Sequence, residues 1–171
     1  MVFFKKSILF FFVILVSSAQ AQHYNFKRFT TKNGVAHPIV QQIVQDHEGY
    51  FWLATQGGLN RFDGKKFSSF RKSNGLPTSD ITAVLEDENK NIWIGTTEGL
   101  AKFDGISFTS FKNYGLNHQI NSIYKDSKEI IWFCTLGGGI VSFDGKSFKQ
   151  YTRKEGLITD SIFCLIQDYD K

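Results

Sequence analysis

Residues 92–105 read IWIGTTEGLAKFDG, and close relatives of this stretch stand at residues 51–64, FWLATQGGLNRFDG, and at residues 131–145, IWFCTLGGGIVSFDG. The chain has three tryptophans, and each occupies the second position of one of these stretches. A segment that returns at an interval of about 41 residues indicates a repeat architecture. The stretches therefore predict one structural unit that the chain uses several times.

Other residues return with the same period. They are a glycine (Gly34, Gly75, Gly115, Gly156), the tryptophans (Trp52, Trp93, Trp132) and an Asp-Gly pair (Asp63 and Gly64, Asp104 and Gly105, Asp144 and Gly145). An aromatic pair three residues apart closes each unit (Phe67 and Phe70, Phe108 and Phe111, Phe148 and Tyr151). Because these marks are independent of one another, coincidence does not explain them.

Within one unit the pattern is typical of short strands. In the second unit, apolar stretches at residues 80–87, 92–96, 101–103 and 107–111 are separated by polar turns. β-branched and aromatic residues favour strands, and Asp104-Gly105 is a strong hairpin signal. Four antiparallel strands in about 40 to 45 residues are the signature of a propeller blade, which buries its two faces only when it is stacked on its neighbours.

The predicted fold is therefore an all-β propeller of four-stranded antiparallel blades. We predict a lone outer strand D at residues 24–29, blades at residues 35–70, 76–111 and 116–151, and a partial blade at residues 157–171. The lone strand is expected because Phe26 and Phe29 lie 41 residues ahead of Phe67 and Phe70.

The ring that these boundaries predict is incomplete. Since propellers close with four to eight blades, we expect this sequence to be the start of a longer protein. Taken alone, a bare apolar blade face and an unpaired edge would promote self-association. A homodimer is left open.

The first 21 residues have the features of a secretory signal peptide. Two lysines precede an apolar run, residues 8–16, which is shorter than the roughly 20 residues that a membrane-spanning helix needs. Small side chains at Ala19 and Ala21 suit a signal peptidase. We expect cleavage between Ala21 and Gln22, with the product periplasmic or secreted.

Charge and cysteine content exclude several functions. Without the signal peptide, 18 basic residues face 16 acidic ones and lie singly along the sequence, so the clustered basic face of a nucleic-acid-binding protein is missing. Cys134 falls where the other units have Ala54 and Gly95, and Cys164 matches Ala83. We interpret both as buried thiols, with a disulfide between them as the less favoured alternative.

No motif indicates catalysis, a cofactor or a metal. The stretch GIVSFDGKS at residues 139–147 resembles a phosphate-binding loop, but its glycines are wrongly spaced and it occupies the hairpin position of the other units. A single carboxylate at each of Asp63, Asp104 and Asp144 is weak evidence for calcium. The four histidines show no ligand or catalytic spacing.

The pattern running from GLPTSDITAVLED through residues 92–105 resembles the two-component regulator propeller repeat. This family forms periplasmic sensor regions of bacterial histidine kinases, notably hybrid systems of Bacteroidetes. The resemblance implies recognition of an extracellular cue, often a saccharide, and a partner in the remainder of a membrane-bound sensor kinase. Departures are small: Val35 replaces a leucine, and the third unit has one additional residue at Gly137–Ile140.

Two alternatives remain open beside a sensory, non-catalytic module. One is a free-standing secreted propeller that binds glycans or proteins, and the other is a fragment of a propeller lyase or glycosidase. The latter would need acidic or histidine side chains that converge at one end of the central channel, and none recurs at equivalent positions of the repeat.

Loops predict the place of a ligand. With strands A to D in order, the D-to-A connections and the B-to-C turns share one face, and loops on a rigid scaffold usually carry function. The side chains there include rings, an amide and guanidinium groups that suit sugar hydroxyls or acidic sugars. The candidate ligand-binding residues are His37, Arg71, Asn74, Tyr114, His118 and Arg153.

Overall fold

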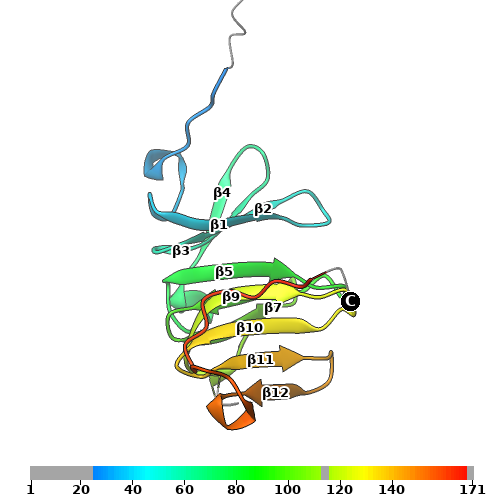
Figure 1. The fold of residues 1–171 in the computed structure, drawn as a ribbon. Helices are drawn as coiled ribbons and strands as arrows, with labels where there is room; N and C mark the ends of the chain where they lie inside the picture. The colour runs from blue at the N-terminus through cyan, green and yellow to red at the C-terminus, as the bar shows by residue number, and fades with distance from the viewer. Residues whose placement is uncertain (1–24, 113–115, 169–171) are drawn as a thin grey trace, which may run out of the picture.

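The computed structural model describes residues 25–112 and 116–168, which form three four-stranded antiparallel sheets (Figure 1). Blade 1 contains β1 (Val40–Gln45), β2 (Phe51–Thr55), β3 (Gly58–Phe62) and β4 (Phe67–Phe70). Blade 2 contains β5 (Ile81–Glu86), β6 (Ile92–Thr96), β7 (Gly99–Phe103) and β8 (Phe108–Ser110). Blade 3 contains β9 (Gln119–Lys125), β10 (Ile131–Leu136), β11 (Ile140–Phe143) and β12 (Phe148–Tyr151).

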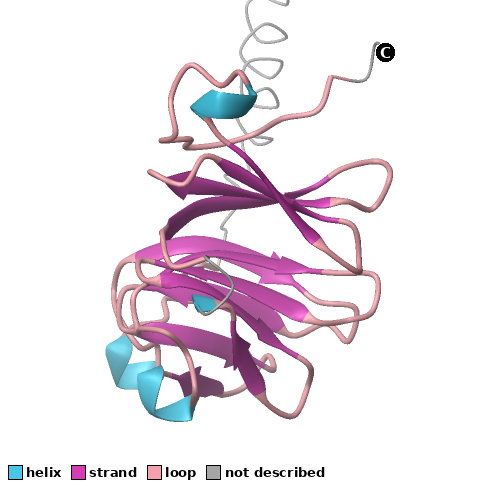
Figure 2. Cartoon of the chain, turned by 90° about the horizontal axis from the view of Figure 1, so that it is seen from below, coloured by secondary structure: helices cyan, strands magenta, loops and turns pink. Residues whose placement is uncertain are grey.

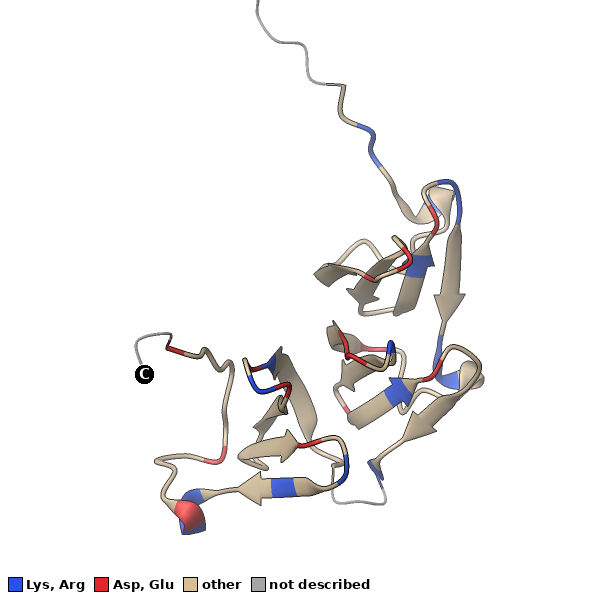
Figure 3. Cartoon of the chain, turned by 90° about the vertical axis from the view of Figure 1, so that its right-hand side faces the viewer, with Lys and Arg blue, Asp and Glu red and all other residues tan. Residues whose placement is uncertain are grey.

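The blades stack face to face and fan out in an open arc (Figure 3). Each sheet pairs its strands in sequence order, as the predicted blade requires. The described helical segments are 3₁₀ turns in the loops (Figure 2): η1 (Thr31–Asn33), η2 (Lys72–Asn74) and η4 (Arg153–Glu155). The expected all-β propeller architecture is confirmed.

The recurring glycine of the loops ends the 3₁₀ turns. Gly34, Gly75 and Gly156 follow η1, η2 and η4 with φ of 103°, 103° and 106°, a left-handed conformation that glycine adopts without strain. Gly115 lies outside the described residues. The glycine therefore recurs about every 41 residues because it ends the turn that reverses the chain between one blade and the next segment.

The recurring aspartates of the C-to-D turns are structural. The Asp63 carboxylate accepts hydrogen bonds from the backbone N–H groups of Lys65 and Lys66, both at 2.8 Å, and Asp104 and Asp144 repeat the arrangement. These N–H groups hold the pKa of each carboxyl below its usual value. The stabilisation is present above the unfolded pKa and is lost as the pH falls through the lower folded value.

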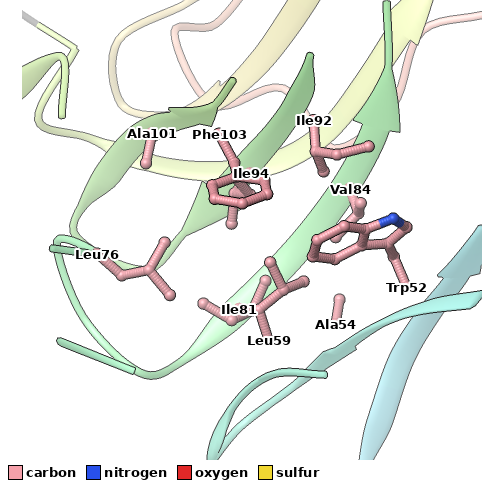
Figure 4. Packing of buried hydrophobic residues seen from close by; sticks show 10 residues of the cluster. All are labelled: Trp52, Ala54, Leu59, Leu76, Ile81, Val84, Ile92, Ile94, Ala101 and Phe103. Atoms are coloured by element: carbon pink, nitrogen blue, oxygen red, sulfur yellow. The ribbon is translucent and has the colours of Figure 1, made fainter. Parts of the chain in front are cut away.

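The tryptophans join neighbouring blades. Trp52 and Trp93 are 2% and 1% exposed, and Figure 4 shows Trp52 of blade 1 facing Val84 and Ile92 of blade 2. The Trp52 ring lies 6.0 Å from Phe70 of its own blade and 5.8 Å from Phe103 of the next blade. The repeat therefore encodes an interface between blades as well as the blade itself.

An aspartate six residues before each tryptophan completes this core. Its Oδ2 accepts the indole N–H at 2.7 Å in Asp46–Trp52, 2.8 Å in Asp87–Trp93 and 2.9 Å in Asp126–Trp132. Burial alone would raise the pKa of Asp126, but the hydrogen bonds from Trp132 and two backbone N–H groups outweigh it and lower the pKa. The bond matters because a buried donor left unpaired costs about 1–3 kcal/mol.

Two sequence expectations need correction at the ends of the described chain. The expected lone strand D forms no strand at residues 25–30, because no strand C lies beside it. Cys164 is exposed rather than buried, because residues 162–168 have no strand B beside them; both cysteines are free thiols. Cys134 is buried as expected, and burial raises the pKa of its thiol.

The expected signal peptide lies outside the described residues. Among the residues that are described, no helix has the length and apolar character to cross a bilayer.

Candidate functional site

The D-to-A connections and the B-to-C turns lie at one end of the blades, on the left in Figure 1. We call this end the D–A rim. In blade 1, Arg71 Nε donates to the carbonyl oxygen of Gly57 at 3.0 Å, which ties the residue after strand D to the B-to-C turn. The predicted shared face of these loops is therefore present.

Two of the candidate ligand-binding residues occupy equivalent places on the D–A rim. A Cβ on Gly57 would lie 3.0 Å from His37 Cβ, and a Cβ on Gly138 would lie 2.6 Å from His118 Cδ2. The His118 imidazole therefore packs over Gly138, and the Cβ of His37 lies beside Gly57, so each histidine stands against a glycine of a B-to-C turn. His118 is exposed, whereas His37 is half-buried and accepts a hydrogen bond from the N–H of Ile39 at 3.2 Å.

The other described candidates are exposed loop residues with local roles. The Asn74 side-chain oxygen accepts from the N–H of Arg71 at 2.8 Å and caps η2. The backbone N–H of Arg153 donates to Asp160 Oδ1 at 2.7 Å. Arg153 is an exposed residue. Tyr114 lies outside the described residues. The described candidates lie on one rim, but a hollow of about 520 Å³ that includes Asn74 is lined by none of the others.

The opposite end of the blades carries a hollow that the sequence did not predict. It has a volume of about 310 Å³ and lies between blades 1 and 2; its lining residues with ionisable side chains are Asp46, His47, Glu48, Arg61, Glu86, Lys90 and Asp104. The Arg61 guanidinium lies 4.6 Å from the centre of the Tyr50 ring and 5.7 Å from that of Trp52. Because the lining residues come from two blades, no local sequence motif predicts this hollow.

A polar link at this end joins the A-to-B turn of each blade to the segment that follows. At the two junctions between blades the link reaches the last residue of strand A in the next blade. After blade 3 it reaches Gln167, at the equivalent position in residues 162–168, which form no strand. His47 Nδ1 lies 2.5 Å from Glu86 Oε1, Glu88 pairs with Lys125, and Gln167 bonds both the backbone and the hydroxyl group of Ser127 at 2.9 and 2.8 Å. The ion pairs with Glu129 and Glu88 raise the pKa of Lys125.

Within the described ranges, no group of three or more His, Cys, Asp or Glu side chains could hold a metal ion. The turn aspartates Asp63, Asp104 and Asp144 accept backbone hydrogen bonds.

Comparison with known proteins defines the class. Residues 75–98 match the model of the two component regulator propeller, and the blades match the fold that this repeat implies. The chain is a β-propeller segment in which residues 75–98 match a two component regulator propeller repeat.

The similar proteins include a histidine kinase and the extracellular domains of two regulatory systems. Over 60 residues the chain is 42% identical to Histidine kinase P4 of Formosa agariphila, a match that covers 35% of this chain and 4% of that kinase. The extracellular domain of the putative hybrid two component system BT3049 from B. thetaiotaomicron superposes with a TM-score of 0.70 at 23% identity, over 88% of this chain and 21% of that one. The extracellular domain of BT4673 from B. thetaiotaomicron superposes with a TM-score of 0.67 at 19% identity, over 83% of this chain and 21% of that one.

The same scaffold also supports an enzyme. Virginiamycin B lyase from Staphylococcus aureus superposes with a TM-score of 0.56 at 13% identity, over 70% of this chain and 42% of the lyase. Such likenesses show the fold alone. The chain spans about a fifth of the length of the two extracellular domains.

Proposed function

We propose that this chain is a propeller segment of the periplasmic sensor region of a two-component histidine kinase and that it recognises an extracellular carbohydrate. The observation that carries the proposal is the 42% identity to a histidine kinase over 60 residues. Extracellular placement is supported by the fold of the two-component extracellular domains and by the signal-peptide pattern of residues 1–21.

The D–A rim supports the choice of a carbohydrate ligand. Its imidazoles and guanidinium groups stand on loops that stacked blades hold in place, and glycines of the B-to-C turns leave the rim open beside them. Rings can lie against the apolar face of a sugar, while charged donors form strong hydrogen bonds with hydroxyl or carboxylate oxygens. Enzymatic action is not part of the proposal.

We expect glycan binding by the mature chain to weaken about tenfold or more when Arg71 and His118 are both changed to alanine, because a hydrogen bond to a charged group contributes about 1.5–3 kcal/mol. A glycan array would select the ligand, and calorimetry would measure its affinity. The matched control is Lys146→Ala, which removes a charge at the exposed C-to-D turn of the opposite end. Failure to bind any member of a broad neutral and acidic panel would contradict the proposal.

The placement in a sensor kinase is tested on the native gene product. An antibody raised against residues 22–171 should detect a membrane-associated polypeptide much larger than the 19.5 kDa of this chain. Amino-terminal sequencing should begin at Gln22, because small residues precede that position. A small soluble product would instead favour the secreted propeller, and a product that retains Met1 would contradict signal cleavage.

A further inference from the structure

The hollow of about 520 Å³ lies between blades 1 and 2, beside their outer strands C and D. We call it the outer hollow and define it by Arg61, Phe70, Asn74, Phe103, Ile106 and Phe108. Small-molecule sites have volumes of roughly 300–1,000 Å³ and combine an apolar lining with a few polar groups. The outer hollow has the size and the mixed lining of such a site.

Three phenylalanine rings form its apolar part. Phe70 of blade 1 lies 5.8 Å from Phe103 and 5.4 Å from Phe108 of blade 2, and the latter two rings are 4.7 Å apart. Phe103 is buried, whereas Phe70 and Phe108 are only half-buried. The cluster therefore leaves apolar ring surface on the lining of the outer hollow.

The C-to-D turn of blade 2 adds an isoleucine to this lining. Ile106 is 92% exposed, and the same turn position holds Lys65 in blade 1 and Lys146 in blade 3. In all three turns the backbone N–H of this residue donates to the turn aspartate, so the turn itself does not require an apolar side chain. One exposed isoleucine is ordinary, but this one stands beside the phenylalanine rings.

Arg61 supplies a positive charge that no described carboxylate pairs with. Its guanidinium lies 4.6 Å from the centre of the Tyr50 ring and 5.7 Å from that of Trp52, and these are its side-chain interactions with described residues. A guanidinium presents N–H donors in a planar fork that matches a carboxylate. Because the rings restrict its plane, less freedom is lost when an anion binds.

The carboxylates nearby have partners of their own. The hollow of about 310 Å³ meets the outer hollow at Arg61 and has four carboxylates in its lining. Of these, Asp46 accepts an indole N–H, Glu86 pairs with an imidazole, and Asp104 accepts two backbone N–H groups of its own turn. Most of this negative charge is thus already engaged, and the guanidinium stays available to an anion from solvent.

The outer hollow offers few other polar groups. The side-chain oxygen of Asn74 accepts the N–H of Arg71, which leaves the Asn74 amide nitrogen as a donor. The Ser107 hydroxyl already donates to Asp104 Oδ2 at 3.3 Å. A sugar would bring several hydroxyl groups that each need a partner when they are buried. One free cation, one amide and three phenylalanine rings suit a more apolar anion.

We propose that the outer hollow binds a small organic carboxylate with an apolar body, such as an aromatic acid, at a site separate from the carbohydrate site of the D–A rim. The Arg61 guanidinium donates to the carboxylate, and the apolar body packs against the phenylalanine rings and Ile106. At the junction of blades 2 and 3 the positions of Arg61 and Ile106 hold Lys102 and Lys146. Of the two described junctions, only the first therefore pairs a guanidinium with an isoleucine.

Phenylacetate is a suitable probe, and NMR of the isotope-labelled mature chain would detect its binding. We expect a saturable shift of the Ile106 methyl and Ser107 amide signals, whereas the methyl signals of Ile158, which is 96% exposed and lies outside the outer hollow, should not move. Phenylacetamide has the same shape without the charge. It should bind about tenfold more weakly or worse, as expected when a charge-assisted hydrogen bond is lost.

Two substitutions test the residues that define the site. Arg61→Gln should weaken phenylacetate binding about tenfold or more. The matched control is Lys102→Gln, which removes a charge from the same strand position of blade 2 and should leave binding unchanged. Arg61→Lys places the residue of blade 2 in blade 1, which preserves the charge if Arg61→Gln unfolds the chain, and it should still weaken binding because the planar fork is lost.

Ile106→Ser should weaken binding several-fold at an unchanged unfolding midpoint, because the side chain it shortens is exposed. Three results would overturn the proposal. One is the absence of shifts at Ile106 and Ser107 up to about 20 mM phenylacetate, a range that includes weak small ligands. The second is equal affinity of Arg61→Gln and the unchanged chain. The third is tighter binding of glucuronate than of phenylacetate, since the site would then select a sugar acid.

Discussion

Changing Trp93 to alanine is expected to lower the free energy of unfolding by about 3–5 kcal/mol, the usual cost of truncating a fully buried large aromatic side chain. Trp93 is 1% exposed and lies 5.3 and 5.2 Å from Phe133 and Phe143 of the next blade. Its removal opens a cavity at the junction of blades 2 and 3 and leaves the Asp87 carboxylate without its indole partner. Urea unfolding followed by tyrosine fluorescence would measure the loss.

Trp132→Ala is the matched control. It removes the same residue from the same position of the repeat and breaks the same indole–aspartate bond, but Trp132 is only half-buried because no complete blade covers it. We expect less than about half the destabilisation of Trp93→Ala, since less apolar area is lost. Equal losses would show that the tryptophan acts within its own blade and would contradict its role between blades.

The second large effect is expected for Gly99→Ala. Gly99 has φ of 121°, and a Cβ there would lie 2.4 Å from the carbonyl oxygen of Leu116 in the D-to-A connection. The clash is with backbone, so no side chain can move to relieve it. Strain from the positive φ and overpacking should together cost about 3 kcal/mol or more.

Gly105→Ala separates these two contributions. Gly105 has φ of 94°, and nothing lies within 4 Å of a Cβ built on it. The substitution should cost only the roughly 1–2 kcal/mol of a left-handed non-glycine residue. Thermal unfolding of both variants measures the difference, and a Gly105→Ala variant as unstable as Gly99→Ala would refute the proposed backbone clash.

The strands could be predicted from the sequence because the repeat shows the same local signals several times. The stretch IWIGT was expected as a strand and is β6, Ile92–Thr96. The following strand begins at Gly99, two residues before the predicted apolar run, because glycine pairs in the ladder opposite Thr96. Sequence pattern therefore located the strands better than it located their ends.

Features that join blades were harder to predict. The aspartate before each tryptophan recurs in the sequence, but its hydrogen bond to the indole is visible only in three dimensions. The links His47–Glu86, Glu88–Lys125 and Ser127–Gln167 join residues 37 to 40 positions apart and have a different residue type at each equivalent position. The links occupy equivalent positions in the repeat, but because their residue types differ, a search for recurring residues does not find them. For the D–A rim, the sequence predicted the shared face but not which side chains meet there.

Because these three polar links differ in charge, their stability depends to different degrees on the salt concentration. Dissolved salt screens the exposed pair of Glu88 and Lys125, whereas the neutral contact of Ser127 with Gln167 has no net charge to screen. The indole-filled interior recurs almost unchanged at the two junctions between complete blades, so it sets the shape of the arc. The polar links at the surface differ from one junction to the next. A single surface substitution can therefore change the stability of one junction without affecting its neighbour.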